Sequence, residues 1–418
     1  MKPENAEWTV ALTFSGGGTR AAALAYGVLQ ELSRTRIDHH GRAERMLDHV
    51  QAISGVSGGS FTAAYYALHG DRLFADYENI FLKRDVQGAL MRKFASPQNW
   101  FPLATKRIGR SDLAGEFYDH EIFGGATFGD LAHEAGRPRL LVNATDMVTG
   151  MPFAFTQQNF DLIGSNLGEI TIGRAVAASS AAPVVLSPVT LRNHAAADGA
   201  ARSAFAQRLS VDLDALHVSR QLASAVRSYF DTERRPFIHL VDGGVSDNLG
   251  LHGLLDLNVA TRGLDAALHD CNLSQVRNIA VIVVNASAEH AVRSNTRSHP
   301  GVTDVLRAVS EGFVHTNTAR ALADFRSELE QWREGGVGRS SHLIEINFDQ
   351  LTHPEERNFF SSLPTSFSLP PESVDRLRDV GARLLRQSGT FQTFLREFNP
   401  ADAERFADVN RMLVPSAA

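Results

Sequence analysis

The segment Gly55–Gly59 places Ser57 between glycines at both second-neighbour positions. The apolar run His49–Ile53 before it predicts a strand, and the run Ser60–Leu68 after it predicts a helix. A nucleophile elbow has this pattern, because its tight and strained turn must project a serine hydroxyl from the edge of a sheet. Side chains at the glycine positions would collide with the turn or block an incoming acyl group. Taken alone, the pattern fits an ordinary glycine- and serine-rich turn equally well.

A second glycine-rich turn follows the strand-like run Trp8–Phe14 and precedes a helix-like run. Backbone N–H groups in such a turn can converge on an anion, and the helix N-terminus adds a favourable dipole. We therefore expect an oxyanion hole made by the amides of Gly17 and Gly18, with Gly16 shaping the loop. Arg20 would pair either with a substrate phosphate or with a carboxylate that pins the loop. P-loop and dinucleotide fingerprints do not fit, because the chain has no Lys-Ser or Lys-Thr here and alanine follows Arg20.

Asp242 and two glycines follow a third apolar run, Pro236–Val241. A carboxylate at a strand end can reach a serine on another loop, although an aspartate in this position is more commonly a turn residue or a helix N-cap. The presence of three strand and glycine-loop units in one chain favours catalysis. Asn143 and Asp146 also lie at a strand end and could buttress the site, but an ordinary turn pair is the simpler interpretation.

A Ser–His–Asp triad is the rival arrangement, since the chain contains 16 histidines. His252 lies where a helix is expected, shortly after Asp242. His239 lies inside an apolar strand, where a histidine is more commonly structural. His194 lies near Asp198, and no strand-like run precedes that aspartate, which makes Asp198 the weaker candidate for the base.

Three motifs resemble those of the patatin-like phospholipase family: Gly16–Arg20, Gly55–Gly59 and Asp242–Gly244, in this order. The resemblance extends to residues 144–146, 177–183 and 363–367, and it covers residues 7–385. It implies a lipid acyl hydrolase that uses a dyad of Ser57 and Asp242. Two positions depart from the family pattern. The family often has glycine at the position of Ala21 and aspartate at the position of Ser15. Both positions lie at the edge of the loop.

Strand-like runs alternate with helical stretches and predict an α/β fold, a three-layer sandwich around a central, mostly parallel sheet. These runs are Val10–Phe14, Val50–Ile53, Leu140–Ala144, Phe237–Val241, Ile279–Val284 and Leu343–Phe348. Nearly continuous apolar strands are typical of a sheet that helices cover on both faces. Active sites of such sheets lie beyond the carboxyl ends of the strands, where all three glycine loops fall.

We expect one patatin-like catalytic domain over residues 1–400, with helical insertions near 79–135 and 202–235, and a C-terminal helix and tail at 401–418. The second insertion, with a helical stretch at 213–230, would be a lid, part of an acyl-chain pocket or a packing helix. Residues 302–332 predict a long amphipathic helix that faces the core. Further helices are expected at 370–385 and 391–398.

The net charge of −6 argues against nucleic acid as a partner. The lone Cys271 excludes an intramolecular disulfide and a multi-cysteine metal site. No loop has EF-hand spacing, so we expect neither a metal nor another cofactor.

Residues 79–110 mix basic with apolar and aromatic side chains, a composition that suits peripheral contact with anionic lipid headgroups. A solvated helix pair is the simpler alternative. The mixed charge of residues 1–5 predicts no signal peptide, and no run reaches the roughly 18 apolar residues of a membrane span. The sequence thus predicts a cytoplasmic protein, and it leaves peripheral membrane contact through residues 79–110 as the alternative to a solvated helix pair.

The predicted activity is hydrolysis of phospholipid or lysophospholipid esters through an acyl-enzyme on Ser57, with Asp242 as the base. Acyl transfer to an alcohol is a variant of this chemistry. The alternative from another class is a catalytically silent protein that holds an anion or a lipid in its glycine loops.

Overall fold

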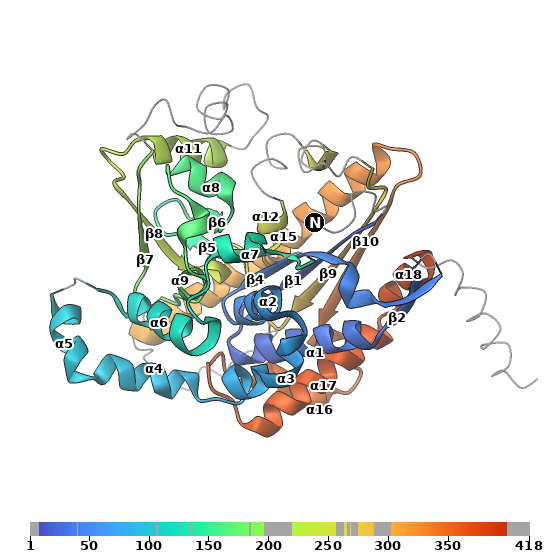
Figure 1. Ribbon diagram of the computed structural model, residues 1–418, viewed down its shortest axis with the longest axis horizontal. Coiled ribbons are helices and arrows are strands. Elements are labelled where there is room, and N and C mark those ends of the chain that lie inside the picture. Colours follow the sequence, from blue (N-terminus) through green and yellow to red (C-terminus); the bar gives the residue numbers. More distant parts are fainter. Residues whose placement is uncertain are drawn as a thin grey trace, which may run out of the picture.

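The computed structural model describes residues 8–39, 41–105, 108–133, 136–183, 185–195, 220–255, 263–265, 268, 275–287 and 302–398. Asp198, Cys271 and the predicted segments 202–219 and 401–418 lie outside these residues. Figure 1 shows a central sheet with helices on both of its faces, which is the predicted α/β sandwich.

The central sheet has the strand order β10-β9-β1-β4-β5-β8-β7, and β6 pairs with β5. Its strands are β1 (Trp8–Phe14), β4 (Val50–Val56), β5 (Arg139–Asp146), β6 (Pro152–Ala154), β7 (Val189–Arg192), β8 (Phe237–Asp242), β9 (Asn278–Asn285) and β10 (Ser340–Asn347). The five strands from β10 to β5 are parallel, whereas β6 and β8 run antiparallel to β5, and β7 runs antiparallel to β8. The six predicted strands are confirmed. The short strands β6 and β7 and the polar hairpin of β2 (Arg36–His39) and β3 (Arg42–Arg45) were not predicted.

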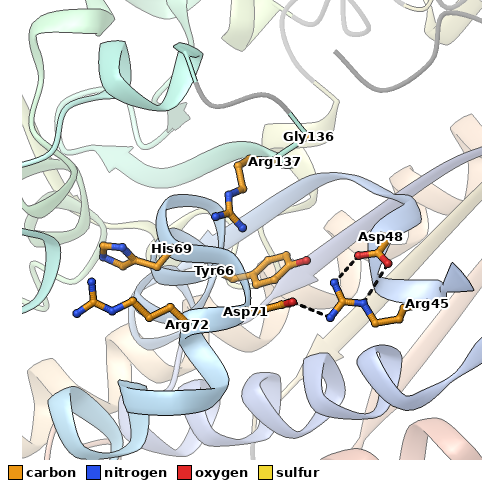
Figure 2. A pocket seen from close by; sticks show the side chains of 8 residues that line it. All are labelled: Arg45, Asp48, Tyr66, His69, Asp71, Arg72, Gly136 and Arg137. Atoms are coloured by element: carbon orange, nitrogen blue, oxygen red, sulfur yellow. Dashed lines mark hydrogen bonds and ion pairs between the residues drawn. The ribbon is translucent and has the colours of Figure 1, made fainter.

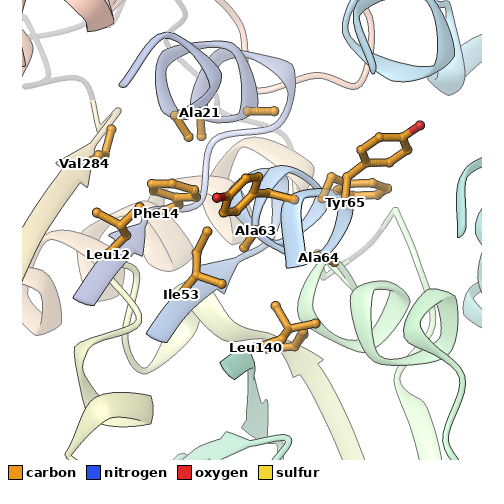
Figure 3. Packing of buried hydrophobic residues seen from close by; sticks show 14 of the residues in the cluster. Leu12, Phe14, Ala21, Ile53, Ala63, Ala64, Tyr65, Leu140 and Val284 are labelled. Carbon is orange, nitrogen blue, oxygen red and sulfur yellow. The ribbon is translucent and has the colours of Figure 1, made fainter. Parts of the chain in front are cut away.

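Helices cover the two faces of the sheet unequally. The larger core includes buried residues of α1 (Thr19–Arg34), α2 (Gly58–His69), α9 (Ile172–Ser179) and α17 (Pro371–Gln387). The smaller core, on the opposite face, includes α12 (Leu251–Leu254) and α15 (Val302–Glu334). Successive residues of β1 alternate between them: Leu12 and Phe14 lie in the larger core, part of which Figure 3 shows, and Ala11 lies in the smaller. Burial on both faces explains why the central strands are apolar throughout.

The remaining helices surround this framework. They are α3 (Leu73–Tyr77), α4 (Val86–Ala95), α5 (Pro97–Ala104), α6 (Arg110–Tyr118), α7 (Phe128–His133), α8 (Gln157–Leu162), α11 (Arg220–Phe230), α16 (Pro354–Ser362) and α18 (Gly389–Phe398). Buried Phe325, Leu329 and Trp332 confirm that the C-terminal part of α15 faces the core. No helix among the described residues combines the length and the apolar character that crossing a membrane requires.

The direction of β8 determines how Asp242 reaches the site. β1 and β4 are parallel neighbours, so the loops after them lie at one edge of the sheet, as predicted. β8 instead runs against β5, and it pairs only with the last three residues of that strand. Val56 pairs with Asn143, and Asp242 pairs with the next residue, Ala144. The antiparallel strand therefore brings Asp242 level with the end of β4.

Candidate active site

Ser57 occupies a strained turn between β4 and α2. Its backbone has φ 47° and ψ −120°, and it is the single non-glycine residue with positive φ in the part of the chain that the structure describes. A serine in this conformation requires support from its surroundings. The glycines around it supply space: a Cβ at Gly55 would lie 2.6 Å from Cα of Ser60, and one at Gly59 would lie 2.6 Å from the carbonyl oxygen of Phe14.

Ser179 holds the backbone of this turn. The N–H of Ser57 donates to Oγ of Ser179 at 2.8 Å, and that hydroxyl donates to the carbonyl of Asn143 at 2.6 Å. The side-chain amide of Asn143 donates to Ser54 and to the carbonyl of Gly55, at 2.8 and 3.0 Å. Ser179, Asn143 and Ser54 are buried, so this network fixes the turn away from water. The sequence placed Ser179 in the resembling segment 177–183 but predicted no role for it, because one hydroxyl in an alanine-rich helix gives no spacing signal.

The carboxylate of Asp242 lies directly against the hydroxyl of Ser57. Oγ of Ser57 donates to Oδ2 of Asp242 at 2.9 Å, and the N–H of Gly244 donates to Oδ1 at 2.8 Å. Thr145 holds the backbone of this aspartate, since its hydroxyl donates to the carbonyl of Asp242 at 2.9 Å. Burial raises the pKa of Asp242 to about 6, against the opposing effects of the Gly244 and Ser57 hydrogen bonds. A carboxylate with this pKa is a stronger base than an exposed aspartate and stays ionised at neutral pH.

None of the three histidines considered for a triad lies where a triad needs it. Nδ1 of His252 lies 3.2 Å from the buried carboxylate of Asp247, and Nδ1 of His239 lies 3.0 Å from the hydroxyl of Thr190. His194 is exposed. Among the described residues, no histidine makes a hydrogen bond or ion pair with the Ser57 hydroxyl or the Asp242 carboxylate.

The Gly16–Gly18 loop lies against the serine turn. A Cβ on Gly16 would lie 3.3 Å from Cβ of Ser57, and one on Gly58 would overlap the carbonyl oxygen of Gly18. The N–H of Gly16 donates to the carbonyl of Asn248 at 3.1 Å, so it is not available to an oxyanion. Gly17 and Gly18 have φ of 141° and 62°, and their N–H groups donate no hydrogen bond to any described residue. Two backbone donors thus remain available beside Ser57.

Arg20 lies buried at the start of α1, where its Nη1 donates to the carbonyl of Leu363 at 2.6 Å. The neighbouring Thr19 N–H donates to the carbonyl of Ser366 at 2.8 Å. These contacts favour the loop-pinning alternative for Arg20, and the Leu363 carbonyl is one acceptor that holds it.

Asp146 begins a turn, in which the N–H of Val148 donates to its Oδ1 at 3.0 Å, and it also forms a buried ion pair that the sequence did not predict. Nη2 of Arg235 donates to both carboxylate oxygens at 2.9 and 2.8 Å, and the hydroxyl of Tyr229 donates at 2.9 Å. Because Tyr229 belongs to α11 and Arg235 precedes β8, this pair joins the second predicted insertion to the end of β5. Within the described residues, no three His, Cys, Asp or Glu side chains cluster as metal ligands would.

Comparison with known proteins gives a family match over part of the chain. Residues 12–208 match the family model of patatin-like phospholipases, and Asp242 lies beyond the matched residues. No curated protein matches the chain.

Among solved structures, human GIVD cytosolic phospholipase A2 is similar, with 14% identity and a TM-score of 0.41 over 93% of this chain and 63% of that chain. The same protein in complex with methyl gamma-linolenyl fluorophosphonate and terbium chloride gives 15% identity and a TM-score of 0.38 over 93% of this chain and 60% of that chain. This chain therefore spans about three fifths of the length of those structures.

Proposed function

We infer that residues 12–208 belong to the patatin-like phospholipase family and that the chain is a lipid acyl hydrolase. We propose in particular that it cleaves carboxylic esters of phospholipids or lysophospholipids, with Ser57 as the nucleophile and Asp242 as the base. The observation that carries this proposal is the 2.9 Å hydrogen bond from the Ser57 hydroxyl to the Asp242 carboxylate, at a positive-φ turn.

In the proposed acylation step, Oγ of Ser57 attacks the ester carbonyl carbon while its proton moves to Asp242. The carbonyl oxygen becomes an oxyanion, which the N–H groups of Gly17 and Gly18 stabilise. The N-termini of α1 and α2 adjoin this position, and their dipoles favour the same negative charge. The tetrahedral intermediate then expels the alcohol, which takes the proton from Asp242, and leaves an acyl group on Ser57.

Deacylation repeats the sequence with water. Asp242 takes a proton from the attacking water, the second oxyanion forms beside the same two amides, and Ser57 leaves as its hydroxyl after regaining the proton. Ser179 acts as a positioning residue, because it holds the Ser57 N–H and not a reacting atom. Arg20 has the role of fixing the loop through Leu363.

A fluorophosphonate probe tests the nucleophile. The native protein is expected to gain one phosphonyl adduct, and peptide mapping by mass spectrometry should place it on the peptide containing Ser57. The adduct forms because an activated serine beside an oxyanion hole attacks phosphorus as it attacks an ester. Ser57→Ala should remain unlabelled, and Ser362→Ala, which changes an exposed serine at the end of α16, should be labelled like the wild type. Well-folded protein that stays unlabelled would support the binding-only alternative.

We also propose that residues 79–110 rest on the lipid surface that supplies the substrate. Trp100 on α5 is 61% exposed and Met91 on α4 is 43% exposed, and the neighbouring Arg92 is exposed as well. Apolar and basic groups that share a surface gain from burial in the interface and from attraction to anionic lipids.

Trp100→Ala is therefore expected to weaken binding to vesicles that contain anionic phospholipid by about 5-fold or more. Co-sedimentation over a lipid titration measures this effect. Phe237→Ala is the matched control, because Phe237 is 49% exposed on β8, outside this segment. Equal losses in the two variants would contradict the assignment of 79–110 as the membrane-contact segment.

A further inference from the structure

A polar pocket of about 430 Å³ lies at the C-terminal end of α2, and Figure 2 shows its lining. Tyr66 and His69 of α2 contribute to it, and the carboxyl end of that helix is opposite the end that follows Ser57. A helix of 12 residues is about 18 Å long, so the pocket is separate from the candidate active site. Neither Ser57 nor Asp242 lines it.

Most charges around this pocket are already paired. Arg45 makes ion pairs with Asp48 at 2.6 Å and with Asp71 at 2.8 Å, as the dashed lines in Figure 2 mark. Arg72 pairs with Asp76 at 2.7 Å. Arg45, Asp48 and Asp71 form one cluster, called the Arg45 group, in which one cation and two carboxylates give a net charge of about −1. The pair of Arg72 and Asp76 is neutral.

Arg137 is different, because its guanidinium makes no hydrogen bond or ion pair with any described residue. It lies against Gly70, where a Cβ would overlap Nη1 of Arg137, so the glycine provides the space that the guanidinium occupies. Figure 2 shows this side chain extending into the pocket above Tyr66. A guanidinium offers five N–H donors in a planar fork that matches the oxygens of a phosphate or carboxylate.

Tyr66 adds a second donor. This residue is only 6% exposed, yet its hydroxyl has no hydrogen-bond partner among the described residues. Because Tyr66 lines the pocket, a ligand bound there can accept a hydrogen bond from this hydroxyl. Burial raises the pKa of Tyr66, and the charges of Asp48 and Asp71 raise it further, which keeps the hydroxyl protonated as a donor.

We propose that this pocket binds a ligand through a singly charged phosphodiester group, which accepts hydrogen bonds from Arg137 and from the Tyr66 hydroxyl. Arg137 pairs with no carboxylate of the described residues, so its charge favours an anionic ligand. The net negative Arg45 group on the same pocket repels additional negative charge, so a monoanion is favoured over a dianion. A lipid headgroup and a free glycerophosphodiester share this chemistry.

Calorimetric titration with glycerophosphocholine tests the proposal, at constant ionic strength and on protein whose active-site serine has been blocked with the phosphonate. Where Ser57 proves unreactive, the same titration is done on the untreated protein, so the outcome does not depend on the proposed hydrolysis. The wild type is expected to bind the diester. The affinity of Arg137→Gln should be at least about 10-fold lower, and that of Tyr66→Phe should be several-fold lower. Dianionic glycerol 3-phosphate should bind more weakly than the diester.

Arg139→Gln is the matched control, since Arg139 is exposed two residues away, does not line the pocket and carries the same charge. It should bind within about two-fold of the wild type. No binding by the wild type, unchanged binding by Arg137→Gln, or an equal loss in Arg139→Gln would overturn the proposal.

Phosphatidylcholine vesicles distinguish the two sources of the phosphodiester. If the ligand is a lipid headgroup, Arg137→Gln reduces co-sedimentation and glycerophosphocholine competes with the vesicles. If the ligand is the free diester, it binds in the titration while vesicle binding is the same in Arg137→Gln and the wild type. Each result supports the phosphodiester site and assigns its source.

Discussion

Asp242→Asn is expected to lower kcat for ester hydrolysis by about 10²–10⁴-fold, the usual contribution of a general base. The asparagine keeps the shape of the side chain but cannot take the proton of the Ser57 hydroxyl. Steady-state release of fatty acid from a lysophospholipid measures the effect. In the wild type, activity should fall as the pH drops through about 6, because the base is protonated below its pKa.

His252→Ala is the control that separates a dyad from a triad. Its partner is Asp247 and not Asp242, so this variant should keep most of the wild-type turnover. If His252→Ala were as inactive as Asp242→Asn, the Ser57–Asp242 dyad would give way to a histidine mechanism.

Asp242→Asn should also stabilise the folded protein. The pKa of this group rises from 3.8 to about 6 on folding, so the native state binds the proton more tightly than the unfolded chain. The resulting destabilisation is absent below pH 3.8, develops as the pH rises toward 6 and is complete above it. The substitution should therefore raise the free energy of unfolding by up to about 3 kcal/mol at pH 8 and by little at pH 4. Urea titrations at the two pH values would reveal the difference, and an equal effect at both would contradict it.

Gly58→Ala is expected to lower kcat by about 10²-fold or more, comparable to the loss of an oxyanion-hole donor. The added methyl group would overlap the carbonyl oxygen of Gly18 and would lie 2.6 Å from its Cα. Both atoms belong to the backbone, so the whole Gly16–Gly18 loop must shift away from Ser57. Hydrolysis rates and the rate of fluorophosphonate labelling should fall together.

Gly389→Ala provides the matched control for this substitution, because a Cβ at Gly389 would meet nothing within 4 Å. It should leave turnover and labelling unchanged. Circular dichroism shows whether Gly58→Ala remains folded. A folded Gly58→Ala protein with normal turnover would mean that the position of the glycine loop does not control the reaction.

Local sterics made the serine turn and the central strands predictable. The glycines around Ser57 are required by contacts within a few residues and with the adjacent loop, and such contacts leave a short pattern. The apolar run of β9 similarly reflects burial on both faces, with Ile282 in one core and Val283 in the other. These features depend on nearby sequence or on a simple periodicity.

Features that depend on distant contacts were not predictable. The residues of β8 do not encode its direction, because the same side chains can pair with a neighbour in either direction. Arg20 donates to the carbonyl of Leu363, 343 residues away, and no local pattern could predict that contact. Ser179 contacts Ser57 across 122 residues through a single hydroxyl. The pocket between Tyr66 and Arg137 likewise combines the end of α2 with a segment far along the chain.

The long separation between Ser57 and Asp242 has a consequence during synthesis. The two residues are 185 positions apart, so Asp242 is the 185th residue that a ribosome adds after Ser57. At usual translation speeds this takes about 10–40 s. A nascent chain therefore carries the proposed nucleophile well before the proposed base, and the Ser57–Asp242 hydrogen bond can form only after both residues have been synthesised.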